Sequence, residues 1–185
     1  MIKGFSISKL LKKIIFLDRD GVINHDHGYV VDIKKFEFID GVFDACNYFS
    51  KLGYELIVIT NQSGIARKYF TEKDFLNLTK WMKEEFKNNG INILEVYYCP
   101  HGPEDNCECR KPNIGMITQA NNDFDIDLQK SWLIGDKISD IQTGLNANIK
   151  NNILIKSSYN NKDKDEKIAS YTANSLIDAV NIIKE

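Results

Sequence analysis

The sequence predicts an α/β protein with a Rossmann-like, mostly parallel sheet that is covered by helices on both faces. Short apolar segments rich in β-branched residues alternate with segments whose apolar residues recur at helical spacing. This alternation is typical of βαβ units, in which crossover helices cover both faces of a parallel sheet. The 185 residues, 43% of them hydrophobic, are enough for one substantial core, so we expect a single domain over 1–185.

The first half of the chain is expected to supply two strands and two helices. The apolar run at 14–17 is the first strand, and a helix follows at 42–52, where apolar residues recur on one face. The segment YELIVIT at 54–60 is rich in β-branched residues and is expected to be the second strand. A capping box that begins at Thr71 opens a long helix at 71–87.

The second half of the chain continues the same alternation. Runs such as ILEVYY and NNILIK read as buried strands, and the segments between them have helical spacing. The remaining strands are expected at 93–98, 131–136 and 151–156, and the remaining helices at 115–124, 140–147 and 175–184.

The charge and composition of the chain exclude several classes of partner. A formal net charge of −2 leaves no clustered basic surface for nucleic acid or for an anionic membrane, so an anionic ligand must be bound locally. Lys12 and Lys13 interrupt the apolar run near the start, which ends at Asp18, so we expect neither a signal peptide nor a membrane span. These observations predict a cytoplasmic protein. The absence of long unpaired apolar stretches favours a monomer.

Three of the expected strands end in polar motifs. The motifs are Asp18-Arg-Asp-Gly after the first strand, Thr60-Asn-Gln-Ser-Gly after the second and Gly135-Asp-Lys-Ile-Ser-Asp after the fourth. In open α/β sheets ligands bind beyond the carboxyl ends of the strands, so the three segments should meet in one crevice. One Asp-x-Asp motif alone is often a pair of solvated loop charges, whereas three motifs in register indicate a functional site.

The carboxylates expected in this crevice suit a magnesium ion. Asp18 and Asp20 stand two residues apart on an extended segment, so their side chains point the same way. Together with Asp136 they offer only hard oxygen ligands, which favours Mg²⁺ over a transition metal. A magnesium site of this kind binds best when a phosphate oxygen completes its coordination.

Other residues of the motifs suit a phosphate group. Thr60 and the amides of the loop at 61–64 can donate hydrogen bonds to phosphate oxygens, and Lys111 and Lys137 offer positive charge. The sequence contains neither a Walker-type phosphate loop nor a G-x-G-x-x-G motif. The residues therefore indicate phosphoryl transfer, and they favour an aspartate as the phosphoryl acceptor.

A second cluster has the composition of a structural zinc site. Three of the four cysteines and one of the three histidines fall within eleven residues, at Cys99, His101, Cys107 and Cys109. Four protein ligands would leave no open position on a tetrahedral zinc ion, which predicts a structural role. A disulfide and three unrelated thiols are the alternatives. Arg110 and Lys111 follow the last ligand directly, so zinc would fix their positions over the crevice.

Four segments in order resemble the motifs of the haloacid dehalogenase (HAD) superfamily of aspartate-nucleophile phosphatases. They are FLDRDGVIN, TNQSG, Lys111 and GDKISD, and the resemblance covers the chain from about residue 14 to residue 155. It implies a Rossmann-like HAD fold. No long insertion separates the first strand from the first helix or the second strand from the zinc loop, so we expect no large cap domain.

The HAD resemblance also implies a role for each motif residue. Asp18 would be the nucleophile, and Asp20 would be the general acid that protonates the leaving oxygen and then the base that activates water. Thr60 would hold the phosphoryl group, Lys111 would neutralise charge, and Asp136 would complete the Mg²⁺ site. Asp140 is implied to lie behind that site.

The zinc loop narrows the resemblance to one subgroup of HAD phosphatases. Combined with DRDGVIN, TNQSGIAR and GDK, it resembles enzymes that act on heptose bisphosphates, with histidinol-phosphate phosphatases as the near alternative. This implies a small sugar phosphate as substrate and a place in heptose precursor synthesis for lipopolysaccharide or capsule. Substrate contacts are expected from three loops and the motif ends, at Gly28, Tyr29, Asn61, Arg67, Arg110 and Lys137.

One residue departs from the subgroup, and two other functions stay open. The subgroup usually has glycine where Lys68 stands, and this lysine either strengthens phosphate binding or is solvated. A non-catalytic module that binds a phosphorylated ligand is a further alternative, although it would not need both Asp18 and Asp20. A nucleic-acid end phosphatase is disfavoured by the near-neutral charge of the chain.

Overall fold

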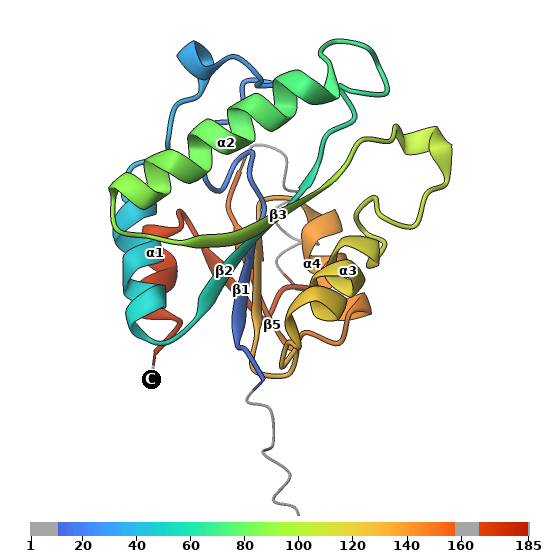
Figure 1. The fold of residues 1–185 in the computed structure, drawn as a ribbon. Coiled ribbons are helices and arrows are strands. Elements are labelled where there is room, and N and C mark those ends of the chain that lie inside the picture. The colour runs from blue at the N-terminus through green and yellow to red at the C-terminus, as the bar shows by residue number, and fades with distance from the viewer. Residues whose placement is uncertain (1–10, 158–166, 185) are drawn as a thin grey trace, which may run out of the picture.

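The computed structural model describes residues 11–157 and 167–184, which form a six-stranded sheet flanked by helices (Figure 1). The sheet has the order β3-β2-β1-β4-β5-β6, and each of its strand pairings is parallel. Its strands are β1 (Ile14–Leu17), β2 (Glu55–Asn61), β3 (Ile93–Cys99), β4 (Trp132–Gly135), β5 (Asn151–Ile155) and β6 (Tyr171–Ala173). The helices are α1 (Val42–Lys51), α2 (Glu72–Asn88), α3 (Gly115–Phe124) and α4 (Ile138–Asn146), with short 3₁₀ helices η1 (Ile33–Lys35), η2 (Pro103–Asp105) and η3 (Ile177–Asn181). The predicted Rossmann-like α/β fold is confirmed.

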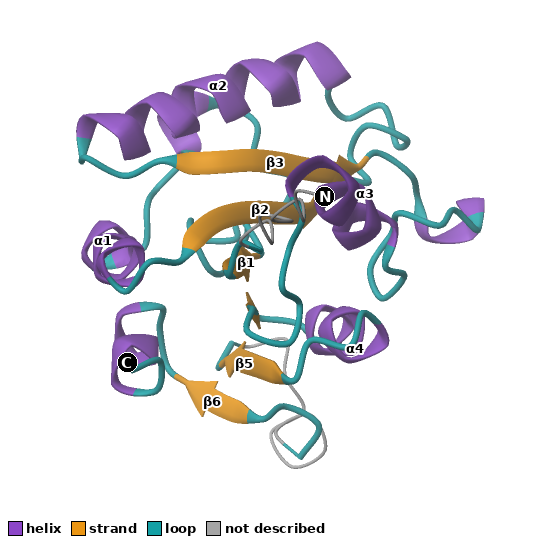
Figure 2. Cartoon of the chain, turned by 60° about the horizontal axis from the view of Figure 1, so that its bottom comes forward, coloured by secondary structure: helices purple, strands orange, loops and turns teal. Residues whose placement is uncertain are grey.

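Two hydrophobic cores lie on opposite faces of the sheet. Helices α1, α2 and η3 cover one face, and α3 and α4 cover the other (Figure 2). Ile15 and Leu17 of β1 point into the first core, and Ile14 and Phe16 point into the second, because successive strand residues face opposite sides. This double burial explains why β1 is a continuous apolar run with no alternation of polar residues.

The strand order places a crevice beyond the carboxyl ends of the central strands. β1 lies between β2 and β4, and the connections from these strands leave toward opposite faces of the sheet. This is a topological switch point, where loops diverge and leave room for a ligand. The polar motifs that follow β1, β2 and β4 therefore lie beside one another.

The long helix α2 begins as the sequence predicts. Thr71 is its N-cap: its hydroxyl accepts a hydrogen bond from the main-chain N–H of Asp74, and the Asp74 side chain accepts one from the N–H of Thr71. This reciprocal pair satisfies two main-chain donors that the first turn would otherwise leave without partners. The hydrogen bonds from Thr71 hold the pKa of Asp74 below its ordinary value.

The C-terminal region differs from the prediction. A short strand, β6, pairs with β5 where no strand was expected, and the helix predicted at 175–184 is reduced to the 3₁₀ helix η3. Ile177, Val180, Ile182 and Ile183 are β-branched, which lowers helix propensity in this stretch. The apolar spacing that suggested a helix comes from packing, since Leu176, Ala179 and Ile183 are buried.

Two further expectations concern what the fold lacks. The connections between β1 and α1 and between β2 and α2 contain no large inserted domain within the described residues, as predicted. None of the helices described combines the length and apolar content needed to cross a bilayer. Residues 1–10, part of the start on which the signal-peptide prediction was based, lie outside the described residues.

Candidate active site and metal sites

Three buried carboxylates gather at the carboxyl ends of β1 and β4. Asp18 directly follows β1, Asp136 directly follows β4, and Asp140 lies in the first turn of α4. One oxygen of each lies within 4.8 Å of the others. The loop after β1 can lie this close to Asp136 only because residue 21 is glycine. A Cβ atom on Gly21 would lie 2.4 Å from Asp136 Oδ2. Both Asp136 oxygens lack a hydrogen-bond partner among the described residues, which fits a carboxylate that binds a cation.

Lys111 reaches this cluster from the loop that follows β3. Its Nζ lies 2.8 Å from Asp18 Oδ1 and 2.6 Å from Asp140 Oδ1, and it donates to the carbonyl of Ile59 at 3.0 Å. The other oxygen of Asp140 accepts the main-chain N–H of Lys137 at 2.9 Å. Both Asp140 oxygens are therefore engaged within the protein, and this residue positions Lys111 and the start of α4.

Asp20 lies outside the carboxylate cluster. Nη2 of the buried Arg19 lies 2.8 Å from each carboxylate oxygen of Asp20, and Asn24 and Gln62 each add a hydrogen bond at 3.0 Å. Burial raises the pKa of Asp20, but the charge and hydrogen bonds of Arg19 outweigh burial and hold it below its usual range. The sequence grouped Asp20 with Asp18 and Asp136, whereas in the structure the third carboxylate of the cluster is Asp140. Asp20 pairs instead with the Arg19 guanidinium.

The cluster carries more negative charge than its lysines neutralise. Burial raises the pKa of Asp18 to about 6, with Lys111 opposing the rise and Asp140 adding to it. Burial also raises the pKa of Asp136 to about 8, and the nearby charge of Asp18 contributes. Lys111 remains cationic: burial lowers its pKa, but Asp140 and Asp18 raise it above the ordinary value. A divalent cation would relieve the repulsion, so the donor set fits Mg²⁺.

Asp136→Asn is expected to stabilise the protein without Mg²⁺ and to abolish its response to Mg²⁺. The pKa of about 8 in the folded state exceeds the value of about 4 for an unfolded carboxyl, so the folded state binds more protons between these values. The stability of the metal-free protein therefore falls as the pH rises from about 4 to about 8. The side-chain amide in the Asp136→Asn variant does not titrate, so the variant does not lose this stability. At about pH 8 the Tm of the variant should lie about 3–6 °C above wild type without Mg²⁺.

Asp44→Asn is the matched control for this prediction. Asp44 is exposed in the first turn of α1 and is not one of the clustered carboxylates, so its variant should follow wild type with and without Mg²⁺. Thermal melts at several pH values, with and without Mg²⁺, provide the measurement. A Tm for Asp136→Asn below that of wild type at about pH 8 without Mg²⁺, or an undiminished rise on adding Mg²⁺, would contradict the assignment.

Gln62 connects the first two motifs. Its Nε2 donates to Asp20 Oδ2 at 3.0 Å and to Thr60 Oγ1 at 2.9 Å. Thr60 is buried near the end of β2, so its hydroxyl is held close to Asp20. Sequence reasoning singled out the amides of this loop and missed the Gln62 side chain, although it stands inside the motif TNQSG. It also missed the buried Arg19, which the position between two aspartates could have indicated.

Asn61 contacts the main chain of Lys111. Its side-chain oxygen accepts the N–H of Lys111 at 3.1 Å, and its Nδ2 donates to the carbonyl of the same residue at 3.3 Å. This reciprocal pair fixes the backbone that carries the lysine. Asn61, which the sequence predicted to contact the substrate, also lines the crevice, and its two hydrogen bonds position Lys111.

A crevice of about 370 Å³ opens beside the cluster. It is bounded by the loops after β1, β2 and β3 and by the start of α4, and five of its lining side chains are charged: Asp20, Asp26, Arg110, Lys111 and Lys137. Lys137 Nζ lies 3.1 Å from Asp26 Oδ2, and the charges of Asp136, Asp18 and Asp26 raise the pKa of this lysine although burial lowers it. Gly28 and Tyr29 also line the crevice, whereas Arg67 is exposed and does not.

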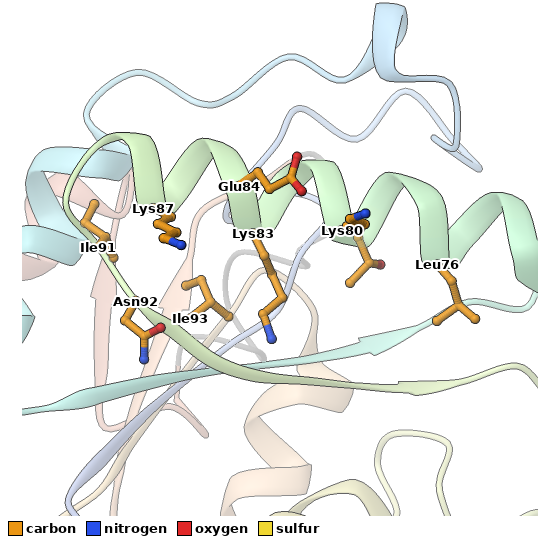
Figure 3. Close-up of a pocket in the computed structure, with 9 residues that line it drawn as sticks. Leu76, Lys80, Lys83, Glu84, Lys87, Ile91, Asn92 and Ile93 are labelled. Atoms are coloured by element: carbon orange, nitrogen blue, oxygen red, sulfur yellow. The ribbon is translucent and has the colours of Figure 1, made fainter.

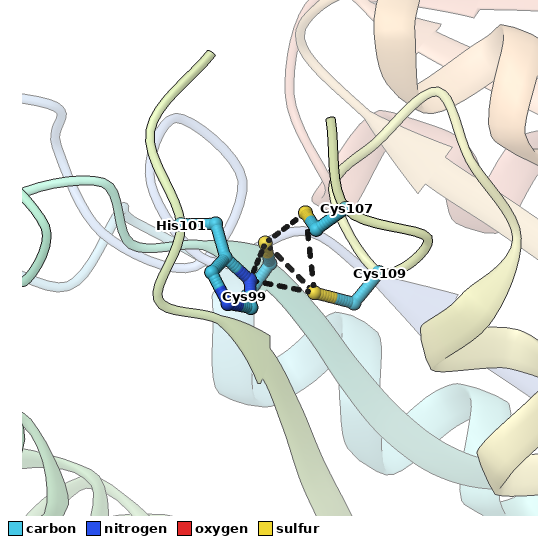
Figure 4. A group of neighbouring side chains, drawn as sticks. All are labelled: Cys99, His101, Cys107 and Cys109. Atoms are coloured by element: carbon cyan, nitrogen blue, oxygen red, sulfur yellow. Dashed lines mark hydrogen bonds between the residues drawn. The ribbon is translucent and has the colours of Figure 1, made fainter. Parts of the chain in front are cut away.

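The predicted zinc ligands meet in the loop after β3 (Figure 4). The sulfur of Cys109 lies 3.0 Å from that of Cys99 and 3.5 Å from that of Cys107, and His101 Nδ1 lies 3.2 Å from the Cys109 sulfur. All four cysteines of the chain are free thiols, so the disulfide alternative is not the arrangement present. Donor atoms around a tetrahedral zinc ion lie about 3.7 Å apart, close to the separations in this cluster. The four residues therefore fit a zinc ion.

The cysteine cluster leads directly into the crevice. Arg110 Nη1 donates to the carbonyl of His101 at 3.2 Å, so the arginine folds back over the loop. Asn113 Nδ2 also donates to the carbonyl of Cys107 at 2.8 Å. The next residue after Arg110 is Lys111, whose Nζ lies among the carboxylates. The loop thus places the cationic side chains of Arg110 and Lys111 in the lining of the crevice.

A separate groove lies between α2 and β3. Its volume is about 420 Å³, with Leu76, Ile91 and Ile93 as apolar surface and lysines such as Lys80 and Lys83 at its side (Figure 3). None of the residues predicted to act on phosphate lines it. The crevice at the strand ends is therefore the candidate functional site.

Comparisons with known proteins show which proteins this chain resembles. A model of the HAD-hydrolase-like family matches residues 108–180. The D-glycero-β-D-manno-heptose-1,7-bisphosphate 7-phosphatase of Yersinia pestis is 46% identical over 177 residues, which cover 92% of this chain and 94% of that protein. The D-glycero-α-D-manno-heptose-1,7-bisphosphate 7-phosphatase of Campylobacter jejuni is 46% identical over 173 residues, which cover 94% and 96%. The crystal structure of a D,D-heptose 1,7-bisphosphate phosphatase from B. bronchiseptica, complexed with magnesium and phosphate, superposes with a TM-score of 0.80 at 27% identity and covers 92% of this chain and 97% of that one.

Proposed function

Because this chain belongs to the heptose-1,7-bisphosphate 7-phosphatase family of HAD-like hydrolases, we propose that it removes the 7-phosphate from D-glycero-D-manno-heptose 1,7-bisphosphate. The relatives at 43–46% identity span more than nine-tenths of the chain, and they are phosphatases of this one class of substrate. The enzyme would thus act as a phosphoric monoester hydrolase in heptose precursor synthesis for lipopolysaccharide or capsule. The relatives include enzymes named for either anomer at the same identity, so they favour neither anomer.

A single observation carries this proposal most strongly: Asp18 sits buried beside Lys111 at the end of β1, and Lys111 lines a crevice rimmed by cations. Lys111 Nζ and the main-chain N–H of Arg19 both lie 2.8 Å from Asp18 Oδ1. These contacts fix the carboxylate and engage the same oxygen. They favour Oδ2 as the atom that attacks phosphorus.

The proposed reaction has two steps on Asp18. In the first, Asp18 Oδ2 attacks the phosphorus of the 7-phosphate, the bond to the sugar oxygen breaks, and an aspartyl phosphate forms. In the second, water attacks the phosphorus, releasing inorganic phosphate and restoring the carboxylate. Lys111 stabilises the negative charge on the phosphoryl oxygens in both steps, and Thr60 offers a hydroxyl donor to them.

Asp20 is proposed to move a proton in each step. The leaving sugar oxygen must gain a proton, and the attacking water must lose one. The low pKa that Arg19 imposes on Asp20 suits the base in the second step. To act as the acid in the first step, the Asp20 carboxyl must exchange its contact with Arg19 for the sugar oxygen and carry a proton. The proton that it removes from the attacking water in the second step restores this acid form for the next turnover, and solvent supplies the proton for the first.

The residues fit a Mg²⁺ ion held by Asp18 and Asp136. Both Asp136 oxygens are available for it within the described part of the chain, and Asp18 lies beside them. When bound, Mg²⁺ would supply positive charge at a phosphoryl oxygen and reduce the repulsion between nucleophile and substrate. The magnesium and phosphate named in the B. bronchiseptica structure support this cofactor.

We also propose that zinc occupies the cysteine and histidine cluster. A metal with four protein ligands has no open position, so its role would be to order the loop that ends in Arg110 and Lys111. Burial raises the pKa of the Cys99 thiol in the metal-free state, and hydrogen bonds with Cys109 add to the rise. Zinc binding would have to remove that proton, so the affinity of the cluster for zinc should rise with pH.

The substrate is tested by Mg²⁺-dependent phosphate release from a panel of compounds at matched concentrations. The panel contains both anomers of heptose 1,7-bisphosphate, histidinol phosphate and a 3′-phosphorylated oligonucleotide. One heptose anomer is expected to have a kcat/KM at least about 100-fold above the last two, because a sugar carrying a second phosphate makes more contacts with the cations of the crevice.

Each other outcome of the panel identifies a different function. A preference for histidinol phosphate would keep the chemistry and move the protein to the alternative subgroup. Efficient, salt-sensitive release from the oligonucleotide would indicate an end phosphatase. No turnover of any compound with Mg²⁺ present would leave a phosphate-binding module.

A further inference from the structure

Two tyrosine rings meet at the mouth of the crevice and lie outside both hydrophobic cores. Tyr29 comes from the loop after β1, and Tyr69 comes from the loop after β2. The ring centroids are 4.7 Å apart and the rings stand at 86°, an edge-to-face pair. Tyr29 is 49% exposed and Tyr69 is 61% exposed. The pair therefore bridges two loops on either side of the crevice while much of its apolar surface stays in contact with solvent.

The backbone of Tyr29 is held in a conformation that its side chain disfavours. Its φ is +54°, in the left-handed region that a bulky residue rarely adopts. On one side, Asp26 accepts the N–H of Gly28 at 2.9 Å and contacts Lys137 Nζ at 3.1 Å. On the other side, the carbonyl of the buried Val30 accepts a hydrogen bond from Arg19 Nη2 at 2.9 Å. Groups of the active site thus fix the main chain on both sides of Tyr29.

The loop that carries Tyr69 is equally constrained. Its N–H donates to the carbonyl of Gly64 at 2.9 Å, and the next residue, Phe70, is buried. A Cβ atom on Gly64 would lie 2.2 Å from the Phe70 ring, so this glycine is required for the loop to close. Lys68, where the subgroup usually has glycine, adopts φ +59°. The loop keeps this costly backbone conformation, and Tyr69 is presented at a fixed position.

Within the described residues, the crevice has no aromatic or aliphatic residue other than Tyr29 in its lining. Among its lining residues in the described chain, Tyr29 alone supplies an aromatic ring, and the rest are charged, polar or glycine. Cations such as Lys111 and Lys137 suit phosphate groups, but they offer nothing to the C–H face of a sugar. Tyr69 does not line the crevice itself and contacts the ring that does.

We propose that Tyr29 contacts the C–H face of the sugar and that Tyr69 is a positioning residue that fixes the orientation of the Tyr29 ring for this contact. The inference rests on the proposed sugar bisphosphate substrate and adds the residues that recognise its carbon skeleton. The pair acts in binding the body of the substrate and takes no part in phosphoryl transfer. Its loss therefore raises KM for the sugar and leaves kcat largely unchanged.

The test compares heptose 1,7-bisphosphate with acetyl phosphate, a small phosphoryl donor without a sugar. The measured quantity is the selectivity, the ratio of kcat/KM for the first compound to kcat/KM for the second. Tyr69→Ala removes the edge-to-face partner and should lower the selectivity about tenfold, mainly through KM for the sugar. Tyr69→Phe keeps the ring and should restore the selectivity to within about twofold of wild type.

Two further variants separate this role from a structural one. Tyr29→Gly removes the ring and accepts the positive φ, so it should lower the selectivity at least as much as Tyr69→Ala without lowering Tm. Tyr171→Ala is the matched control, because Tyr171 is a 45% exposed member of an aromatic pair on β6, at the amino end of that strand. This variant should keep the wild-type selectivity.

Wild-type selectivity in Tyr69→Ala would overturn the inference, as would an equal loss in Tyr171→Ala. A loss confined to kcat would also overturn it, because it would place the pair in the chemical step. If wild type hydrolyses acetyl phosphate with Mg²⁺ but neither heptose anomer, the proposed substrate fails, and the sugar contact fails with it. Failure of the proposed substrate is distinguishable from failure of the sugar contact alone, because the substrate is tested with wild type and the contact is tested with the variants.

Discussion

Replacing Asp18 by Asn is expected to abolish phosphate release, with a loss of about 10⁴-fold or more in kcat. The amide keeps the size of the side chain, and its oxygen can still accept from Lys111 Nζ and from the N–H of Arg19, which both bind Oδ1 in the structure. It cannot attack phosphorus to form an acyl phosphate. The fold should persist, because the substitution removes one of three crowded carboxylates.

The measurement combines turnover with the mass of the protein. Wild type mixed with substrate and quenched in acid should carry one added phosphoryl group, and Asp18→Asn should carry none. Asp44→Asn, on the exposed side of α1, should match wild type in rate and in mass. A folded Asp18→Asn protein that keeps more than about one-hundredth of the wild-type rate would sink the assignment of Asp18 as nucleophile.

Loss of the cysteine and histidine cluster is expected to have the largest effect on stability. Cys109→Ser removes one of four donors and should release zinc, lower Tm by about 10 °C or more and reduce kcat at least about tenfold. Cys109 stands two residues before Lys111, so disorder at the cluster would move the ammonium group that neutralises the phosphoryl charge. Stability and activity should fall together.

Cys46→Ala is the matched control for the loss of a thiol. Cys46 is fully buried on α1, in the core on the other face of the sheet from the one that Cys99 joins. This variant should lose a modest amount of stability, about 1 kcal/mol, and keep the zinc content of wild type. Zinc is measured by elemental analysis and Tm by calorimetry. Wild type purified without zinc, or Cys109→Ser with unchanged zinc content and Tm, would disprove the metal assignment.

The sequence by itself determined the elements whose local pattern is strong. β1 is a run buried on both faces, and the capping pair of Thr71 and Asp74 marks the start of α2. It also determined where chemistry lies, because Asp18 and Asp136 follow strands whose carboxyl ends must meet in a parallel sheet. These features depend on residues that are close in sequence or on general rules of topology.

Only the tertiary structure decided which side chains pair. Asp20 faces Arg19 while Asp140 joins the cluster, and Asn61 fixes the backbone of Lys111, fifty positions along the chain. These partners come from different elements, and their choice depends on the distances that packing sets between them. The strand β6, three residues long, was missed for the same reason, since pairing with β5 forms it and its own pattern is too short to indicate a strand.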